Sequence, residues 1–148
     1  MFQRPGDCHN SPLISIVDDD NAARESLEAL LLSLGYATAV FASAEEFLSS
    51  SLLYQTTVLL SDVQMPGMNG LELQSWLLVS GTRIPIIFIT GRSNEMKKEH
   101  SLQAGAIGFL IKPVNQNSLV VCLQRALATT TAKPFIAQPA MVLRTASA

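Results

Sequence analysis

The sequence has few cysteines and no excess of basic residues, which argues against a disulfide-rich or cysteine-ligated metal protein and against a nucleic-acid-binding protein. Its two cysteines, Cys8 and Cys122, show neither the density of a disulfide scaffold nor the spacing of metal ligands. Charged residues make up 15% of the 148 positions, and ten Lys+Arg against twelve Asp+Glu leave a net charge of -2, the wrong balance for binding a phosphate backbone. We therefore expect two free thiols in a reducing cytoplasm and no direct nucleic acid partner.

Long apolar runs are absent as well. The longest candidates, such as residues 86–89, are strand-sized and far short of the roughly 18 to 20 residues that cross a bilayer. Positions 5–7 hold Pro, Gly and Asp, where a secretory signal needs a continuous apolar segment. The sequence therefore excludes a membrane span and favours a protein that stays in the cytoplasm.

Apolar residues are plentiful nevertheless. They make up 48% of the chain, and the mean hydropathy is +0.28, so the chain should fold. A length of 148 residues suits one domain with tails. We expect a flexible N-terminal segment at 1–12, one domain at 13–128, and a linker or disordered tail at 129–148, where no helical or strand period is long enough to trust.

Short apolar runs alternate with helical periodicity along the domain. The runs lie at 13–17, 36–40, 57–60, 86–89 and 107–111, and four of them are nearly continuously apolar, which suits parallel strands covered on both faces. Helices are predicted at 23–34, after Ser43 with Glu46 in capping-box spacing, at 70–79, at 95–104 and at 115–128. This alternation predicts an α/β fold with a five-stranded parallel sheet, doubly wound into a three-layer sandwich.

Polar residues follow four of the five runs, at the sheet edge where ligands bind in such folds. They are Asp18, Asp19 and Asp20, then Asp62, then Thr90, and finally Lys112 with Pro113. Each alone has an ordinary explanation as a helix cap, strand former or surface residue, but together they fall on one edge. Clustered carboxylates require a cation such as Mg²⁺, a lysine can neutralise a phosphoryl group, and a threonine can donate a hydrogen bond to it. These ingredients indicate phosphoryl transfer to a carboxylate.

Four segments resemble the receiver domain of two-component response regulators. They are ISIVDDDN at 14–21, VLLSDVQMPGMNGLEL at 58–73, PIIFITG at 85–91 and GAIGFLIKP at 105–113. The resemblance covers about residues 13–128 and implies the flavodoxin-like, CheY-like sandwich. The second segment is most similar to receivers that precede a helix-turn-helix output domain.

The resemblance assigns roles to particular residues. It implies that Asp62 is the phosphoacceptor and that Asp18 and Asp19 bind the metal ion, Mg²⁺ or Mn²⁺, together with Asp62. The backbone carbonyl of Gln64 completes that metal site. Asp20 is an acid beyond the family pair, and we expect it to cap a helix.

The remaining roles concern phosphoryl binding and switching. By the same resemblance, Thr90 supplies the switch hydroxyl, Phe109 the switch aromatic ring and Lys112 the phosphoryl-binding ammonium group. The Lys112–Pro113 bond is a candidate cis bond. Phe109 also has the simpler explanation of a core aromatic.

The implied function is that of a signalling domain. A sensor histidine kinase or phosphotransfer protein phosphorylates Asp62, and the domain catalyses only its own phosphorylation and dephosphorylation. Surface change, and a homodimer, are expected on the face from Ser93 to Ala128. About twenty residues after the last predicted helix cannot hold a DNA-binding domain, so a stand-alone receiver and a fragment of a longer regulator both stay open.

Three other functions fit the sequence less well. An FMN-binding flavodoxin-like protein would carry Ser, Thr and Gly after the first strand, whereas this chain carries three carboxylates. A phosphatase of the haloacid dehalogenase type has an aspartyl nucleophile in a D-x-D-x-T pattern, but Ala22 stands in place of the threonine. A receiver-like interaction module without phosphorylation has no support, because every phosphorylation position is intact.

Overall fold

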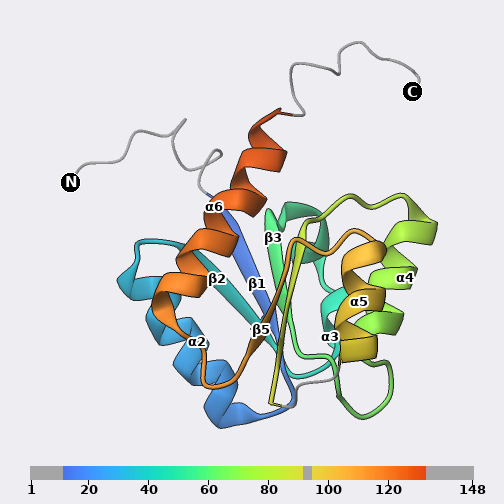
Figure 1. Ribbon diagram of the computed structural model, residues 1–148, viewed down its shortest axis with the longest axis horizontal. Coiled ribbons are helices and arrows are strands. Elements are labelled where there is room, and N and C mark those ends of the chain that lie inside the picture. The colour runs from blue at the N-terminus through green and yellow to red at the C-terminus, as the bar shows by residue number, and fades with distance from the viewer. Residues whose placement is uncertain (1–11, 92–94, 133–148) are drawn as a thin grey trace.

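The computed structural model describes residues 12–91 and 95–132, and the structural statements below concern these residues (Figure 1). Cys8, Ser93, almost all of the predicted N-terminal segment 1–12 and most of the predicted tail 129–148 lie outside them. Within the described residues, no helix is both long enough and apolar enough to cross a membrane.

The strands form one parallel sheet, as predicted. They are β1 (Leu13–Val17), β2 (Ala37–Phe41), β3 (Val58–Ser61), β4 (Ile86–Thr90) and β5 (Gly108–Ile111). Their order in the sheet is β2-β1-β3-β4-β5. Each strand lies within a residue of its predicted position, and Thr90 is the last residue of β4 rather than the first residue after it.

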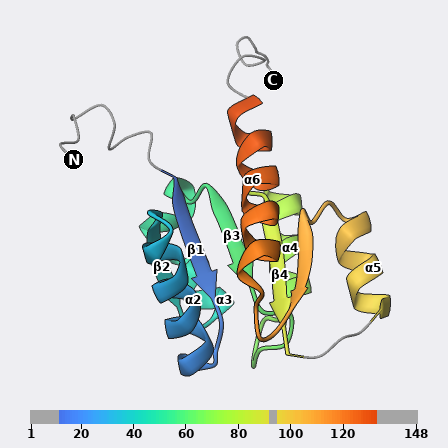
Figure 2. The same cartoon turned by 60° about the vertical axis from the view of Figure 1, so that its left-hand side comes forward.

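Helices cover both faces of the sheet (Figure 2). They are α2 (Asn21–Ser33), α3 (Ala44–Leu48), α4 (Gly70–Ser80), α5 (Glu95–Gln103) and α6 (Gln116–Ala132), with a 3-10 helix η1 (Ser51–Gln55) that was not predicted. On β1, Ile14 and Ile16 pack under α2 and α6, whereas Val17 packs with α3 and α4 on the other face. Alternate residues of a strand point to opposite faces, and here both faces are buried, which explains the continuously apolar runs.

Helix ends follow the predicted capping only in part. Asp20 caps α2, as expected, since its Oδ1 accepts hydrogen bonds from the backbone N–H groups of Ala22 and Ala23 at 3.0 and 3.5 Å. Ser43 caps α3, but the Glu46 carboxylate accepts from the N–H of Ala42 instead of closing the predicted box. A complete capping box forms at α4, where Asn69 and Glu72 each accept from the other's backbone N–H.

The last helix is longer than predicted. α6 continues to Ala132, four residues beyond the expected end at Ala128. Threonines favour strands and turns, which argued for an earlier stop. Inside α6 the Thr129 hydroxyl donates to the carbonyl oxygen of Ala126 at 2.6 Å, so it is satisfied within the helix.

Candidate phosphoacceptor and metal site

Strand order brings two acids from distant parts of the sequence together. β1 and β3 are neighbours, and Val17 pairs with Ser61 at their ends, so Asp18 and Asp62 leave the sheet side by side. The backbone fixes both residues: Asp62 N donates to Val17 O at 2.9 Å, and Asp18 N donates to Phe41 O at 3.1 Å. These two acids therefore sit at the carboxyl edge of the sheet on a rigid frame.

Asp19 completes an acidic cluster with them. One carboxylate oxygen from each of Asp18, Asp19 and Asp62 lies within 4.8 Å of the other two. Asp18 and Asp62 are buried, at 1% and 8% exposure, whereas Asp19 is exposed. Three hard oxygen donors at this spacing fit a divalent cation such as Mg²⁺, and the exposed side leaves room for water ligands.

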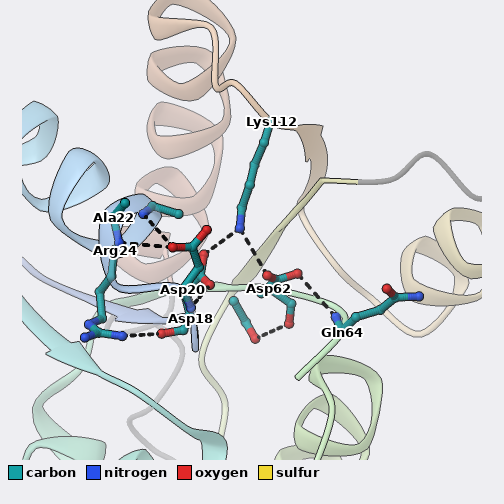
Figure 3. A network of polar contacts seen from close by, with 9 residues as sticks. Asp18, Asp20, Ala22, Arg24, Asp62, Gln64 and Lys112 are labelled. Carbon is teal, nitrogen blue, oxygen red and sulfur yellow. Dashed lines mark hydrogen bonds and ion pairs between the residues drawn. The ribbon is translucent and has the colours of Figure 1, made fainter. Parts of the chain in front are cut away.

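Lys112 reaches the cluster from the end of β5 (Figure 3). Its Nζ atom lies 2.7 Å from Asp18 Oδ2 and 3.1 Å from Asp62 Oδ2. The backbone N–H of Lys112 donates to Thr90 O at 2.7 Å, which holds the lysine against the end of β4. One ammonium group therefore bridges the two buried carboxylates.

The charges perturb one another. Burial raises the pKa of Asp62 above its usual value, the Asp18 charge adds to this rise, and the hydrogen bond and charge of Lys112 oppose it. Burial alone would lower the pKa of Lys112, but its hydrogen bonds to Asp18 and Asp62 outweigh burial and raise that pKa. Lys112 is therefore cationic at neutral pH and partly offsets the repulsion between the two acids.

Short polar contacts fix the loops that carry the acids. Asp18 Oδ1 accepts from the N–H of Asp20 at 2.9 Å, and Arg24 donates to the backbone oxygen of Asp18 at 2.7 Å (Figure 3). Arg24 was not singled out from the sequence. The available signal was a basic residue in the first turn of the helix that follows the acidic end of a strand. On the other loop, the N–H of Gln64 donates to Asp62 Oδ1 at 3.2 Å. The part predicted for the Gln64 carbonyl stays a prediction.

Glycine is required where the loop after Asp62 meets α4. A Cβ atom on Gly70 would lie 2.2 Å from the backbone oxygen of Asp62 and 3.0 Å from Cε1 of Phe88. The N–H of Gly70 donates to Val63 O at 2.8 Å, so the helix starts directly against the end of β3. This close approach brings the start of α4 against the backbone of Asp62.

The predicted switch residues lie on β4, which pairs with β3, and on β5, the next strand along the sheet. Thr90 is buried at the end of β4, and Phe109 is half-buried on β5. Phe109 pairs with Phe88 across the strands, and their ring centroids are 6.3 Å apart. The Lys112–Pro113 peptide bond is cis. The structure thus brings Asp18, Asp19, Asp62 and Lys112 together and places Thr90 beside the backbone of Lys112.

A doubly wound parallel sheet with an acidic cluster and a bridging lysine at its carboxyl edge is the arrangement that the sequence predicts for a receiver-type signalling domain. The response regulator receiver domain family matches residues 14–124, and the chain belongs to this family.

Relatives agree with this assignment. Response regulator protein TmoT of Ectopseudomonas mendocina is 40% identical over 115 residues, which cover 78% of this chain and 52% of TmoT. Transcriptional regulatory protein FixJ of Azorhizobium caulinodans is 33% identical over 114 residues, covering 77% of this chain and 54% of FixJ. The solved structure of response regulator StyR aligns with a TM-score of 0.77 at 35% identity, covering 84% of this chain and 63% of StyR. The chain spans about half the length of the curated relatives it matches.

Proposed function

We propose that this receiver domain accepts a phosphoryl group on Asp62 from a sensor histidine kinase or a phosphotransfer protein, in a reaction that needs Mg²⁺ or Mn²⁺. The observation that carries the proposal is the position of Asp62, a buried carboxylate 3.1 Å from a lysine ammonium and within 4.8 Å of two further acids. An ordinary ion pair between one lysine and one acid does not need two further carboxylates beside that acid. A site for a cation and a phosphoryl group does.

The transfer is a substitution at phosphorus. A carboxylate oxygen of Asp62 forms a bond to phosphorus while the bond from phosphorus to the histidine nitrogen of the donor breaks, and that nitrogen keeps the electron pair and takes a proton from solvent. Lys112 faces the incoming phosphoryl oxygens and neutralises part of their charge. Asp18, Asp19, Asp62 and the Gln64 carbonyl would hold Mg²⁺, which would supply the remaining charge neutralisation when bound.

The same site limits what the domain does. Hydrolysis of the aspartyl phosphate restores the carboxylate, so the chain catalyses its own phosphorylation and dephosphorylation and turns over no separate substrate. We place this activity in the cytoplasm, in keeping with the composition. Regulation of transcription, the property named for FixJ, would then belong to further parts of a longer protein, and this chain itself contacts no nucleic acid.

Phosphorylation is proposed to act on the surface through Thr90 and Phe109. New acceptor oxygens on Asp62 draw the Thr90 hydroxyl toward the site, and the Phe109 ring moves into the space released. The change spreads over the predicted output face, of which residues 95–128 are described, and a homodimer would form there. Hydrogen exchange on wild type and Thr90→Ala, with and without beryllofluoride and Mg²⁺, tests this step. Equal protection changes in both proteins across 95–128 would show that Thr90 is not the switch.

Intact-mass analysis after treatment with acetyl phosphate and Mg²⁺ tests the phosphorylation. We expect the mass of one phosphoryl group on the wild type, and none on Asp62→Asn or on wild type treated with EDTA. Labelling of Asp62→Asn at the wild-type level would move the phosphoacceptor elsewhere. A folded wild type that takes no label with Mg²⁺ bound would make the domain an interaction module instead.

A further inference from the structure

The segment between Asp62 and α4 is held by a side chain from helix α3. Glu45, on α3, accepts a hydrogen bond on Oε2 from the backbone N–H of Met68 at 2.9 Å. Gly67 precedes Met68 with a φ of 73°, and a Cβ atom there would lie 2.7 Å from Glu45 Oε2. Glycine at this position therefore permits both the left-handed turn and the close approach of the carboxylate.

This contact differs from the other hydrogen bonds of the segment. The N–H groups of Gln64, Asn69 and Gly70 donate to Asp62, Glu72 and Val63, respectively, which belong to the segment itself or to the helix that follows. Met68 instead donates across 23 positions of the sequence to a different element. Of these four donors, only Met68 ties the segment to a fixed point outside it.

The element that carries Glu45 is itself firmly seated. Ala44 and Phe47, on either side of Glu45 in α3, have no exposed surface. The Phe47 ring packs edge-on against Phe41 of β2 with ring centroids 5.2 Å apart. The hydrogen bond from Met68 also lowers the pKa of Glu45, so the carboxylate is ionised at neutral pH and accepts strongly. Glu45 is therefore a charged hydrogen-bond acceptor on a helix that is packed into the core.

We infer that Glu45 is a positioning residue for the cation site, because its hydrogen bond to Met68 holds in one arrangement the segment that carries Gln64. The inference rests on the proposed function, which assigns the cation to Asp18, Asp19, Asp62 and the Gln64 carbonyl. Three of these ligands lie within two residues of the ends of β1 and β3, whereas Gln64 lies further along the connecting segment. Its place relative to Asp62 depends on how that segment is held, and outer contacts of this kind tune metal affinity.

The test compares Glu45→Ala and Glu45→Gln with Glu46→Gln. Glu46 is the adjacent exposed acid of the same helix, and its carboxylate accepts from the N–H of Ala42 at 2.8 Å, so it holds the entry to α3 and makes a matched control. Two measurements are made on protein that has met no phosphodonor. Hydrogen exchange without metal reports on residues 63–69, and calorimetric titration with Mg²⁺ reports affinity.

Glu45→Ala is expected to speed exchange across 63–69 and to weaken Mg²⁺ binding roughly tenfold, the lower end of what loss of an outer contact costs. Glu45→Gln should fall between Glu45→Ala and wild type, because its amide oxygen can still accept from Met68. Glu46→Gln should match wild type in both measurements.

Two results would overturn the inference and leave the proposed function standing. One is exchange at 63–69 in Glu45→Ala no faster than in Glu46→Gln. The other is wild-type Mg²⁺ affinity in Glu45→Ala despite faster exchange. A wild type that binds Mg²⁺ but takes no phosphoryl group would overturn the proposed function alone, because the effect of Glu45 on Mg²⁺ affinity is measured without phosphorylation.

Discussion

Replacing Lys112 with methionine removes the cation between two buried acids and keeps most of the side-chain volume. In the wild type its Nζ atom lies 2.7 Å from Asp18 and 3.1 Å from Asp62. Without it, carboxylate oxygens that lie within 4.8 Å of one another face each other with no cation between them. At that separation, and with an effective dielectric constant of about 20, two unit charges repel by about 3 kcal/mol.

We therefore expect Lys112→Met to lose about 3 kcal/mol of unfolding free energy at neutral pH without divalent cations, in line with the cost of breaking a buried ion pair. The loss should depend on pH in a definite direction. Lys112 lowers the pKa of Asp62, so in the variant that pKa rises further above its unfolded value near 4. A carboxyl with a raised folded pKa stabilises the fold below the unfolded pKa and loses that contribution as pH rises through the folded pKa.

Urea denaturation in EDTA at about pH 5 and about pH 8 measures this dependence, because stability that comes from a raised carboxyl pKa is lost as pH rises above the unfolded value near 4. The deficit of Lys112→Met relative to wild type should be larger at the higher pH, and millimolar Mg²⁺ should reduce it by replacing the missing cation. Lys98→Met, which removes an exposed lysine on α5, is the control and should change little. A deficit that is the same at both pH values and with Mg²⁺ would refute the electrostatic reasoning.

Three further outcomes follow from the same contacts. Asp62→Asn should raise the unfolding free energy of the metal-free protein at neutral pH by about 1 kcal/mol, because burial disfavours the charged carboxyl. Its urea midpoint should rise accordingly, and a lower midpoint would contradict this. Gly70→Ala should cost at least about 2 kcal/mol, since its Cβ would lie 2.2 Å from Asp62 O, whereas Gly91→Ala, with no atom within 4 Å, should cost under about 0.5 kcal/mol. In a Cys8→Ser background, the Cys122 thiol should react slowly with a disulfide reagent until urea unfolds the protein, because burial raises the pKa of this thiol. Equal reaction rates with and without urea would show that the thiol is accessible in the folded protein.

The sheet and most of the site could be predicted because their signals are local. The runs at β1, β3 and β4 are apolar on both faces, and that pattern needs no long-range information. The acids follow these strands directly, so the parallel topology alone places them on one edge. The capping role of Asp20 is equally local, since its partners lie two and three residues ahead.

The features that sequence reasoning missed depend on contacts between distant elements or on competing local partners. The contact from Glu45 to Met68 spans 23 positions, and nothing in the Glu45 neighbourhood distinguishes it from Glu46. The predicted box at Ser43 failed because the Glu46 carboxylate had a second donor, Ala42, within reach. Helix α6 is longer than predicted because a threonine hydroxyl can form its hydrogen bond inside a helix, which helix propensity alone does not reveal.

Helix α6 starts near the carboxyl edge of the sheet, the edge that carries Lys112, and runs past the opposite edge (Figures 1 and 2). Its 17 residues make a rod of about 25 Å. For any segment joined beyond Ala132, such a rod sets the rotational phase as well as the distance from the acidic cluster. One residue inserted in the exposed part of the rod would turn that segment by about 100°, whereas seven would return it to within about 20° of its first orientation. The number of residues after the domain would then set the orientation of the attached segment, one rotation of about 100° for each residue, and not only its distance.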